Sequence, residues 1–108
     1  MQKILYGGEE FLTGDEIADA LLAYGRALGD DERAEIVEIP VVEDDGTIVE
    51  AKFLIGPASQ IVAKQVKHPG EELVDDDLVI RLKDLTRAVE SPTAGPLEIS
   101  PSDVPEID

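Results

Sequence analysis

Apolar residues recur at helical spacing in the first quarter of the chain. Ile17, Leu21, Tyr24 and Leu28 follow one another at intervals of four, three and four positions, which places them on one face of an α-helix. The pattern predicts an amphipathic helix over residues 14–28.

Both ends of this predicted helix carry signals of their own. Thr13-Gly14-Asp15-Glu16 has the form of a capping box, in which the Thr13 hydroxyl and the Glu16 carboxylate each accept a backbone N–H of the other residue. Gly29 follows the last apolar position and is suited to end the helix in a left-handed conformation.

Two later segments, residues 34–42 and 47–55, alternate between apolar and polar positions, as half-buried strands do. The residues that share an apolar face are Val37, Ile39 and Val41 in the first segment and Val49, Ala51, Phe53 and Ile55 in the second. The Asp45-Gly46 pair between them is typical of a hairpin turn. Because Pro40 has no N–H for a ladder, we expect the first strand at a sheet edge or a bulge and the second in the interior.

Residues 60–67 follow a Gly56-Pro57 turn and read as a third antiparallel strand, and residues 3–6 add a possible short one. The centre of the chain is therefore predicted to be a β-meander of three to four strands.

A second helix is predicted after a run of three aspartates. Leu78, Leu82, Leu85 and Val89 recur at helical spacing, and acids before and bases within the segment complement the helix dipole. Residues 78–83 also alternate, so a strand at this point is the alternative to the helix.

From residue 91 the composition changes, since four of the seven prolines stand at positions 92, 96, 101 and 105. We therefore divide the chain into an α+β domain over residues 1–90 and a proline-rich acidic tail over residues 91–108.

Charge excludes one class of function. The chain carries 25 Asp and Glu against nine Lys and Arg, a net charge of -16, and so lacks the clustered bases that direct binding to nucleic acid needs. Solubility, salt adaptation or imitation of a polyanion each account for this acidity, and a solvated acidic face is the favoured interpretation. With no cysteine and no long apolar run, we expect a soluble cytoplasmic protein without disulfides or a membrane anchor.

The candidate chemistry is weak. The acids before Gly46 have the composition of a calcium loop. In an EF-hand register, however, Val41 and Lys52 would stand at ligand positions, and neither side chain can bind calcium. The single histidine, His68, is a poor metal site without a thiolate or a second imidazole, and Ser59 lacks the nucleophile-elbow pattern. We expect no catalytic residue, no cofactor and no specific metal.

One sheet face is too apolar to be left in water. Either the two helices cover one face each, or the second face binds a protein partner or another copy of the chain in a homodimer or larger assembly. The residues assigned to this partner surface are Ile36, Pro40, Val42, Ile48 and Leu54, with Lys52, Lys64 and Lys67 from the acid-free residues 51–70, and Leu97 and Ile99 from the tail. We expect the three lysines on adjacent strands.

The leading hypothesis is thus a non-catalytic protein–protein interaction module or accessory subunit, with no direct contact with nucleic acid or membrane. One alternative is an acidic inhibitor that mimics nucleic acid toward a basic protein, through Asp15, Glu16, Asp30, Asp31 and Glu32. A second alternative is a small enzyme that uses paired carboxylates.

Overall fold

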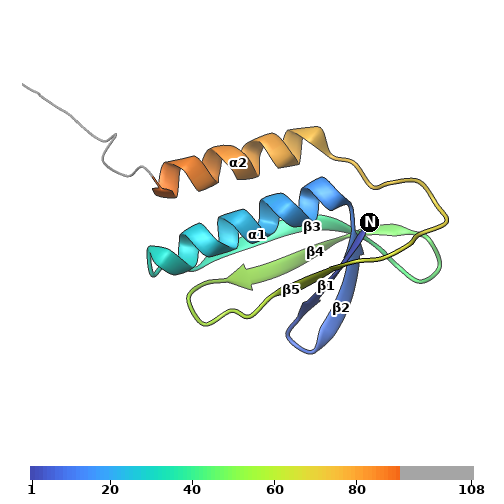
Figure 1. The fold of residues 1–108 in the computed structure, drawn as a ribbon, viewed down its shortest axis with the longest axis horizontal. Coiled ribbons are helices and arrows are strands. Elements are labelled where there is room, and N and C mark those ends of the chain that lie inside the picture. The colour runs from blue at the N-terminus through green and yellow to red at the C-terminus, as the bar shows by residue number, and fades with distance from the viewer. Residues whose placement is uncertain (91–108) are drawn as a thin grey trace, which may run out of the picture.

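The computed structural model describes residues 1–90, which form one α+β domain with two helices and a five-stranded antiparallel sheet (Figure 1). In chain order the elements are β1 (Gln2–Tyr6), β2 (Glu9–Thr13), α1 (Asp15–Asp30), β3 (Glu35–Val42), β4 (Ile48–Ile55), β5 (Val62–Gln65) and α2 (Asp76–Glu90). The α+β class and both helices are confirmed. The predicted tail over residues 91–108 lies outside the described residues.

The predicted meander is wrong in its strand order, which is β4-β3-β2-β1-β5. β2 was missing from the prediction, and β5 pairs with β1 instead of lying beside β4, so β4 is an edge strand and not an interior one. Gly7 and Gly8 have φ values of 61° and 82°, and they form the two-residue turn that pairs Tyr6 with Glu9. This glycine pair turns the short strand expected at residues 3–6 into one arm of a hairpin.

The β1–β2 and β3–β4 hairpins meet at a single point. Only Leu12 and Val42 are in register between β2 and β3. Beside this pair the Thr13 hydroxyl donates to the carbonyl oxygen of Pro40 at 2.8 Å, and both residues are buried. This bond satisfies the Pro40 carbonyl next to the one register pair of β2 and β3, and Pro40 has no N–H that would need a partner there.

The predicted capping box is therefore wrong, because Thr13 bonds across the sheet and not to its own helix. α1 begins at the N-cap Gly14 without a side-chain cap. A distant residue serves instead: the Asp15 backbone N–H donates to Glu72 Oε2 at 2.5 Å.

The helix end also differs from the prediction. Gly29 lies within α1, and Glu32 takes the left-handed conformation with φ of 55°. The Glu32 N–H bonds the Gly29 carbonyl at 3.1 Å and the Arg33 N–H bonds the Leu28 carbonyl at 2.9 Å, the pattern of a Schellman motif.

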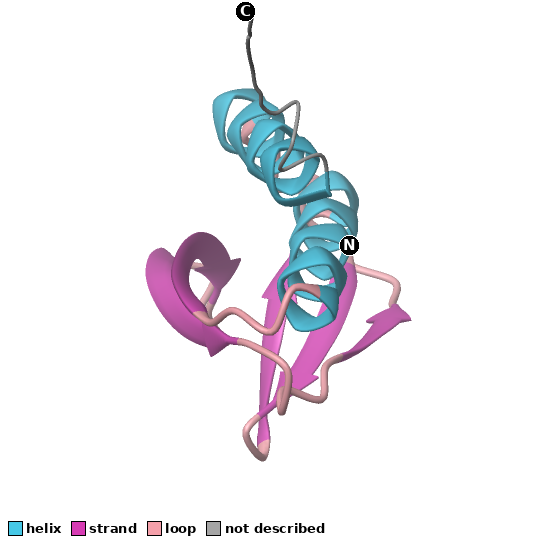
Figure 2. Cartoon of the chain, turned by 90° about the vertical axis from the view of Figure 1, so that its left-hand side faces the viewer, coloured by secondary structure: helices cyan, strands magenta, loops and turns pink. Residues whose placement is uncertain are grey.

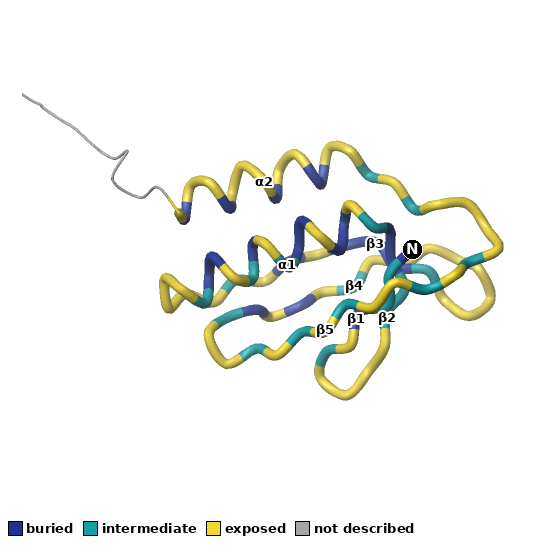
Figure 3. Tube along the Cα trace, viewed as in Figure 1, coloured by how far each residue is buried: buried dark blue, intermediate teal, exposed yellow. Residues whose placement is uncertain are grey.

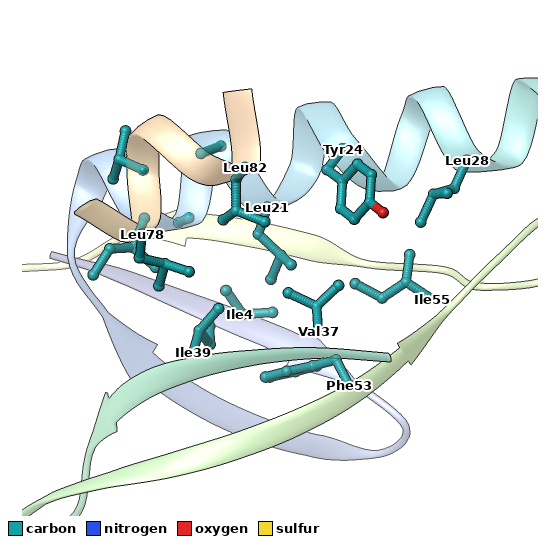
Figure 4. Packing of buried hydrophobic residues seen from close by; sticks show 14 of the residues in the cluster. Ile4, Leu21, Tyr24, Leu28, Val37, Ile39, Phe53, Ile55, Leu78 and Leu82 are labelled. Atoms are coloured by element: carbon teal, nitrogen blue, oxygen red, sulfur yellow. The ribbon is translucent and has the colours of Figure 1, made fainter. Parts of the chain in front are cut away.

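The core lies between α1 and the sheet face that carries Ile4, Val37 and Phe53 (Figure 4). Phe53 is the largest fully buried side chain, and Phe11 meets it edge-on with ring centroids 4.9 Å apart. The predicted helical stripe is buried throughout, at Ile17, Leu21, Tyr24 and Leu28. Each large apolar side chain buried in this way contributes about 1.5–3 kcal/mol, so this layer is the main source of stability.

α2 packs on α1, farther from the sheet than α1 is (Figures 1 and 2). Leu78, Leu82 and Val89 are buried at helical spacing, which excludes the alternative strand over residues 78–83. Burial is concentrated along α1 and the strands beneath it, whereas most of α2 is exposed (Figure 3).

An ionic contact joins the first residue to the start of α1 and to the loop before α2. The Met1 ammonium lies 2.8 Å from Asp15 Oδ1 and 3.0 Å from Glu72 Oε1. The carboxylates of Asp15 and then Glu72 raise the pKa of this ammonium, and the ammonium lowers the pKa of Asp15.

We predict that this contact gives stability a dependence on pH at both ends of the range. The Asp15 contribution is present above the ordinary pKa of 3.8 and is lost as pH falls through the lowered folded value. The Met1 contribution is present below 8.0 and is lost as pH rises through the raised folded value. Urea unfolding from pH 3 to pH 10 should show Asp15→Asn less stable than wild type at neutral pH and less dependent on pH in both windows. Glu16→Gln, in the same helical turn, is the control, and equal profiles for Asp15→Asn and wild type would contradict the assignment.

We further predict that Gly14 tolerates no side chain. A Cβ at this position would lie 1.8 Å from the Leu73 carbonyl oxygen, so backbone must move, and Gly14→Ala should lower the free energy of unfolding by about 2–3 kcal/mol. Gly29→Ala is the matched control, because its Cβ would meet Pro57 at an ordinary 3.9 Å and removal of a helical glycine stabilises by about 0.5 kcal/mol. Chemical denaturation of the two variants should give opposite signs.

Candidate partner-binding surface

No part of residues 1–90 covers the outer face of the β3–β4 hairpin. Ile36 and Leu54 lie opposite each other in the register, and they are 68% and 61% exposed. Both helices lie on the other side of the sheet (Figure 2), so the option of one helix on each face is wrong.

A second apolar pair lies on the other half of the sheet. Leu5 of β1 is opposite Val62 of β5, and these residues are 36% and 58% exposed. Two cross-strand pairs of large aliphatic side chains are thus presented to solvent from one small sheet.

A groove of about 830 Å³ is lined by three of these four side chains, Leu5, Leu54 and Val62. The Gly7-Gly8 turn and residues 56–60 also line it. The groove is therefore built by two turns that are far apart in sequence.

Hydroxyl groups hold this groove in shape. The Tyr6 hydroxyl donates to the Leu54 carbonyl oxygen and lies 3.3 Å from Ser59 Oγ. Ser59 Oγ also accepts from the Gly56 N–H at 2.9 Å, which ties the loop after β4 to itself. These bonds make Tyr6 and Ser59 positioning groups in the wall of the groove.

The predicted surface residues divide into two groups. Ile36, Ile48 and Leu54 are exposed as expected, although Ile48 lies at the far end of β4. Pro40 is buried and Val42 is half-buried, because β2 joins β3 there, so placing Pro40 on the exposed face was wrong. The tail residues assigned to the surface, Leu97 and Ile99, lie outside the described residues.

The lysines are not brought together by adjacent strands. Lys52 is on β4 and Lys64 is on β5, which are the two opposite edges of the sheet, and Lys67 follows β5. Lys52 Nζ lies 3.9 Å from Glu38 Oε2 on the neighbouring strand β3. Lys64 lies opposite Lys3 of β1 in the register. The expected cluster on neighbouring strands is therefore wrong.

The acidic turn has a structural role. Asp45 Oδ1 accepts from the Thr47 hydroxyl at 2.7 Å and from the Thr47 N–H at 3.0 Å, and these bonds lower the pKa of Asp45. Within residues 1–90, no three His, Cys, Asp or Glu side chains are grouped as metal ligands. No helix of the described chain is long and apolar enough to cross a bilayer.

The acids of the inhibitor hypothesis are spread over both ends of α1. Asp15 and Glu16 start the helix, and Asp30 ends it. The 15 intervening steps separate them by about 22 Å, given a rise of ~1.5 Å per residue.

Reasoning from the sequence missed Leu5, Tyr6 and Val62 as surface residues. The alternation of Ile4, Leu5 and Tyr6 already placed Leu5 on the face opposite the other two. Only the pairing of β1 with β5 shows that this face continues across Val62.

Comparisons with protein-family models, with curated proteins and with solved structures found no match for this chain.

We predict that Tyr6→Phe destabilises the protein by about 1 kcal/mol, because the Leu54 carbonyl loses the Tyr6 hydroxyl as a donor and keeps only the longer bond from Ser59 Oγ at 3.5 Å. Tyr24→Phe is the matched control: burial, with a smaller contribution from Glu35, raises the pKa of Tyr24, and none of the groups that shift it is a hydrogen-bond partner. Urea unfolding should give a change within about 0.5 kcal/mol for Tyr24→Phe. An equal loss of unfolding free energy in the two variants would show that the Tyr6 hydroxyl does not stabilise the groove.

Proposed function

We propose that this chain is a non-catalytic protein–protein interaction module that binds a partner through the outer sheet face and its groove. The observation that carries the proposal is the exposure of Ile36, Leu54, Leu5 and Val62 as two cross-strand pairs. Contiguous apolar surface of this kind is typical of binding sites, whereas single exposed apolar residues are common everywhere.

The rim of the groove indicates the chemistry of the partner. Glu9 and Glu10 line it and are exposed, and the whole chain carries a net charge of -16. A partner with an apolar centre and a rim of Lys or Arg complements this surface, because opposite potentials speed the encounter and fix its orientation.

The same rim disfavours face-to-face pairing of two copies. A two-fold contact through the groove would bring Glu9 and Glu10 of one copy close to those of the other. We therefore place a basic partner ahead of self-association for this face.

The polar groups of the groove support binding over catalysis. The Tyr6 hydroxyl and Ser59 Oγ are engaged with backbone groups, and the two glutamates are exposed at the rim. A catalytic acid or nucleophile needs a neighbouring group that adjusts its pKa or activates it. The hydrogen bonds of these two hydroxyls go to the backbone of the loop instead.

We predict that Leu54→Asp reduces capture of the partner from host lysate at least about tenfold, or 1.4 kcal/mol, because it places a charge at the centre of the apolar surface. Ile80→Asp, on the exposed side of α2, is the matched control and should leave capture unchanged. Thermal unfolding of both variants checks that the fold is retained, which we expect because both positions are exposed.

Light scattering at low and high salt separates the two kinds of partner. A monomer whose capture depends on Leu54 supports the proposal. Equal capture by wild type and Leu54→Asp, or a stable dimer that Leu54→Asp dissociates, would contradict binding of a basic partner through this face.

A further inference from the structure

Among the described elements, no strand lies beside β3 on the side away from β4 until β2 meets it at Val42. β3 pairs with β4 along its whole length, but with β2 only where Val42 meets Leu12. Within residues 1–90, the part of β3 before Pro40 therefore has an open edge on the side away from β4.

The backbone groups on that edge follow from the hairpin geometry. The Glu43 N–H donates to the Thr47 carbonyl at 2.7 Å, so Glu43 bonds toward β4. Because hydrogen bonding alternates along an antiparallel pair, Ile36 and Glu38 direct their N–H and C=O groups away from β4. The hydrogen bond from Thr13 to the Pro40 carbonyl agrees with this alternation, since Pro40 is the next residue on the same edge.

A groove of about 570 Å³ runs between this edge and α2. Ile36, Val37 and Glu38 line it from β3, and Leu82 and Leu85 line it from α2. Tyr24 of α1 also contributes to the lining. The groove thus offers backbone hydrogen bonds on one wall and apolar side chains on the other, the arrangement to which an extended segment adds as a strand.

The groove is also the place where bases outnumber acids in this acidic chain. Arg33, Lys52 and Arg81 line it, together with Glu35 and Glu38. Arg33 and Lys52 form ion pairs with Glu35 and Glu38, so Arg81 is the lining base for which residues 1–90 show no ion pair. Arg81 therefore favours an occupant that combines apolar residues with an acidic one.

The chain carries such a segment directly after α2. Residues 96–100 read Pro-Leu-Glu-Ile-Ser, so Leu97 and Ile99 share one face of an extended strand and Glu98 has the other. Residues 91–108 contain four acids and no base. This segment matches the groove in both pattern and charge.

The length of the connection is sufficient. α2 ends at Glu90, and Leu85 in the groove lies five residues earlier, about 8 Å back along the helix. The six residues 91–96 span up to about 20 Å when extended, so the chain can turn and return along α2.

We propose that residues 97–99 of this chain add as a strand to the open edge of β3, in the groove between β3 and α2. Leu97 and Ile99 contact Leu82 and Leu85, and Glu98 has the opposite face of the added strand. This groove shares Ile36 with the outer sheet face but has no lining residue in common with the groove beside Leu5, so the inference goes beyond the function proposed above.

Introduced cysteines test the proposal directly, because the chain has none of its own. In Leu85→Cys/Ile99→Cys, oxidation should close an intramolecular disulfide at least about tenfold faster than in Ile80→Cys/Ile99→Cys, because docking raises the effective concentration of the pair. Ile80 is exposed on α2 and does not line the groove. Equal rates would overturn the proposal, and a predominant disulfide between two chains would assign the groove to the tail of a second copy instead.

Amide hydrogen exchange on the full chain gives a second readout. The Ile36 and Glu38 amides should be protected in wild type and should exchange at least about tenfold faster in Leu97→Asp/Ile99→Asp, since those substitutions remove the apolar contacts. The Val37 amide, which faces β4, is the internal control and should not change. Exchange of the Ile36 and Glu38 amides at the same rate in both proteins would overturn the proposal, and an unchanged rate for the Val37 amide shows that the sheet is still folded.

Discussion

Packing of α1 against the sheet is the interaction on which the rest of this structure depends. The two hairpins share one register pair, Leu12 with Val42, and one side-chain hydrogen bond from Thr13 to Pro40. So short a junction fixes little by itself, since a two-stranded hairpin is only marginally stable in water. The apolar stripe of α1 contacts both hairpins through Ile4 and Val37, and so makes one core out of two weak units.

Because one helix, α1, covers one face of the sheet, much of the sheet is exposed. α2 packs on α1, so it deepens the helical layer without covering any of the outer face. β2 leaves β3 after one pair, which opens the edge at Ile36 and Glu38. An uncovered apolar face and an open strand edge are both liabilities for a free monomer, and both are natural places for a second polypeptide to bind.

The local parts of this fold were predictable and the long-range parts were not. The helices followed from apolar spacing such as that of Leu21 and Leu28, and the β3–β4 hairpin followed from Asp45-Gly46. Thr13 was misread because a capping box is a local pattern, whereas its hydroxyl bonds Pro40, which is 27 residues away. The groove was missed for the same reason, because it exists only once Val62 pairs beside Leu5.

The position of α2 has a consequence for how the domain opens. It is joined to the rest of the domain through the loop at Leu73, which lies against Gly14, and it packs mainly on α1. Its release would leave the sheet and the inner face of α1 together while exposing the side of α1 around Tyr24. Because α2 is also the element that joins residues 91–108 to the domain, any local opening of α2 would move the attachment point of that segment.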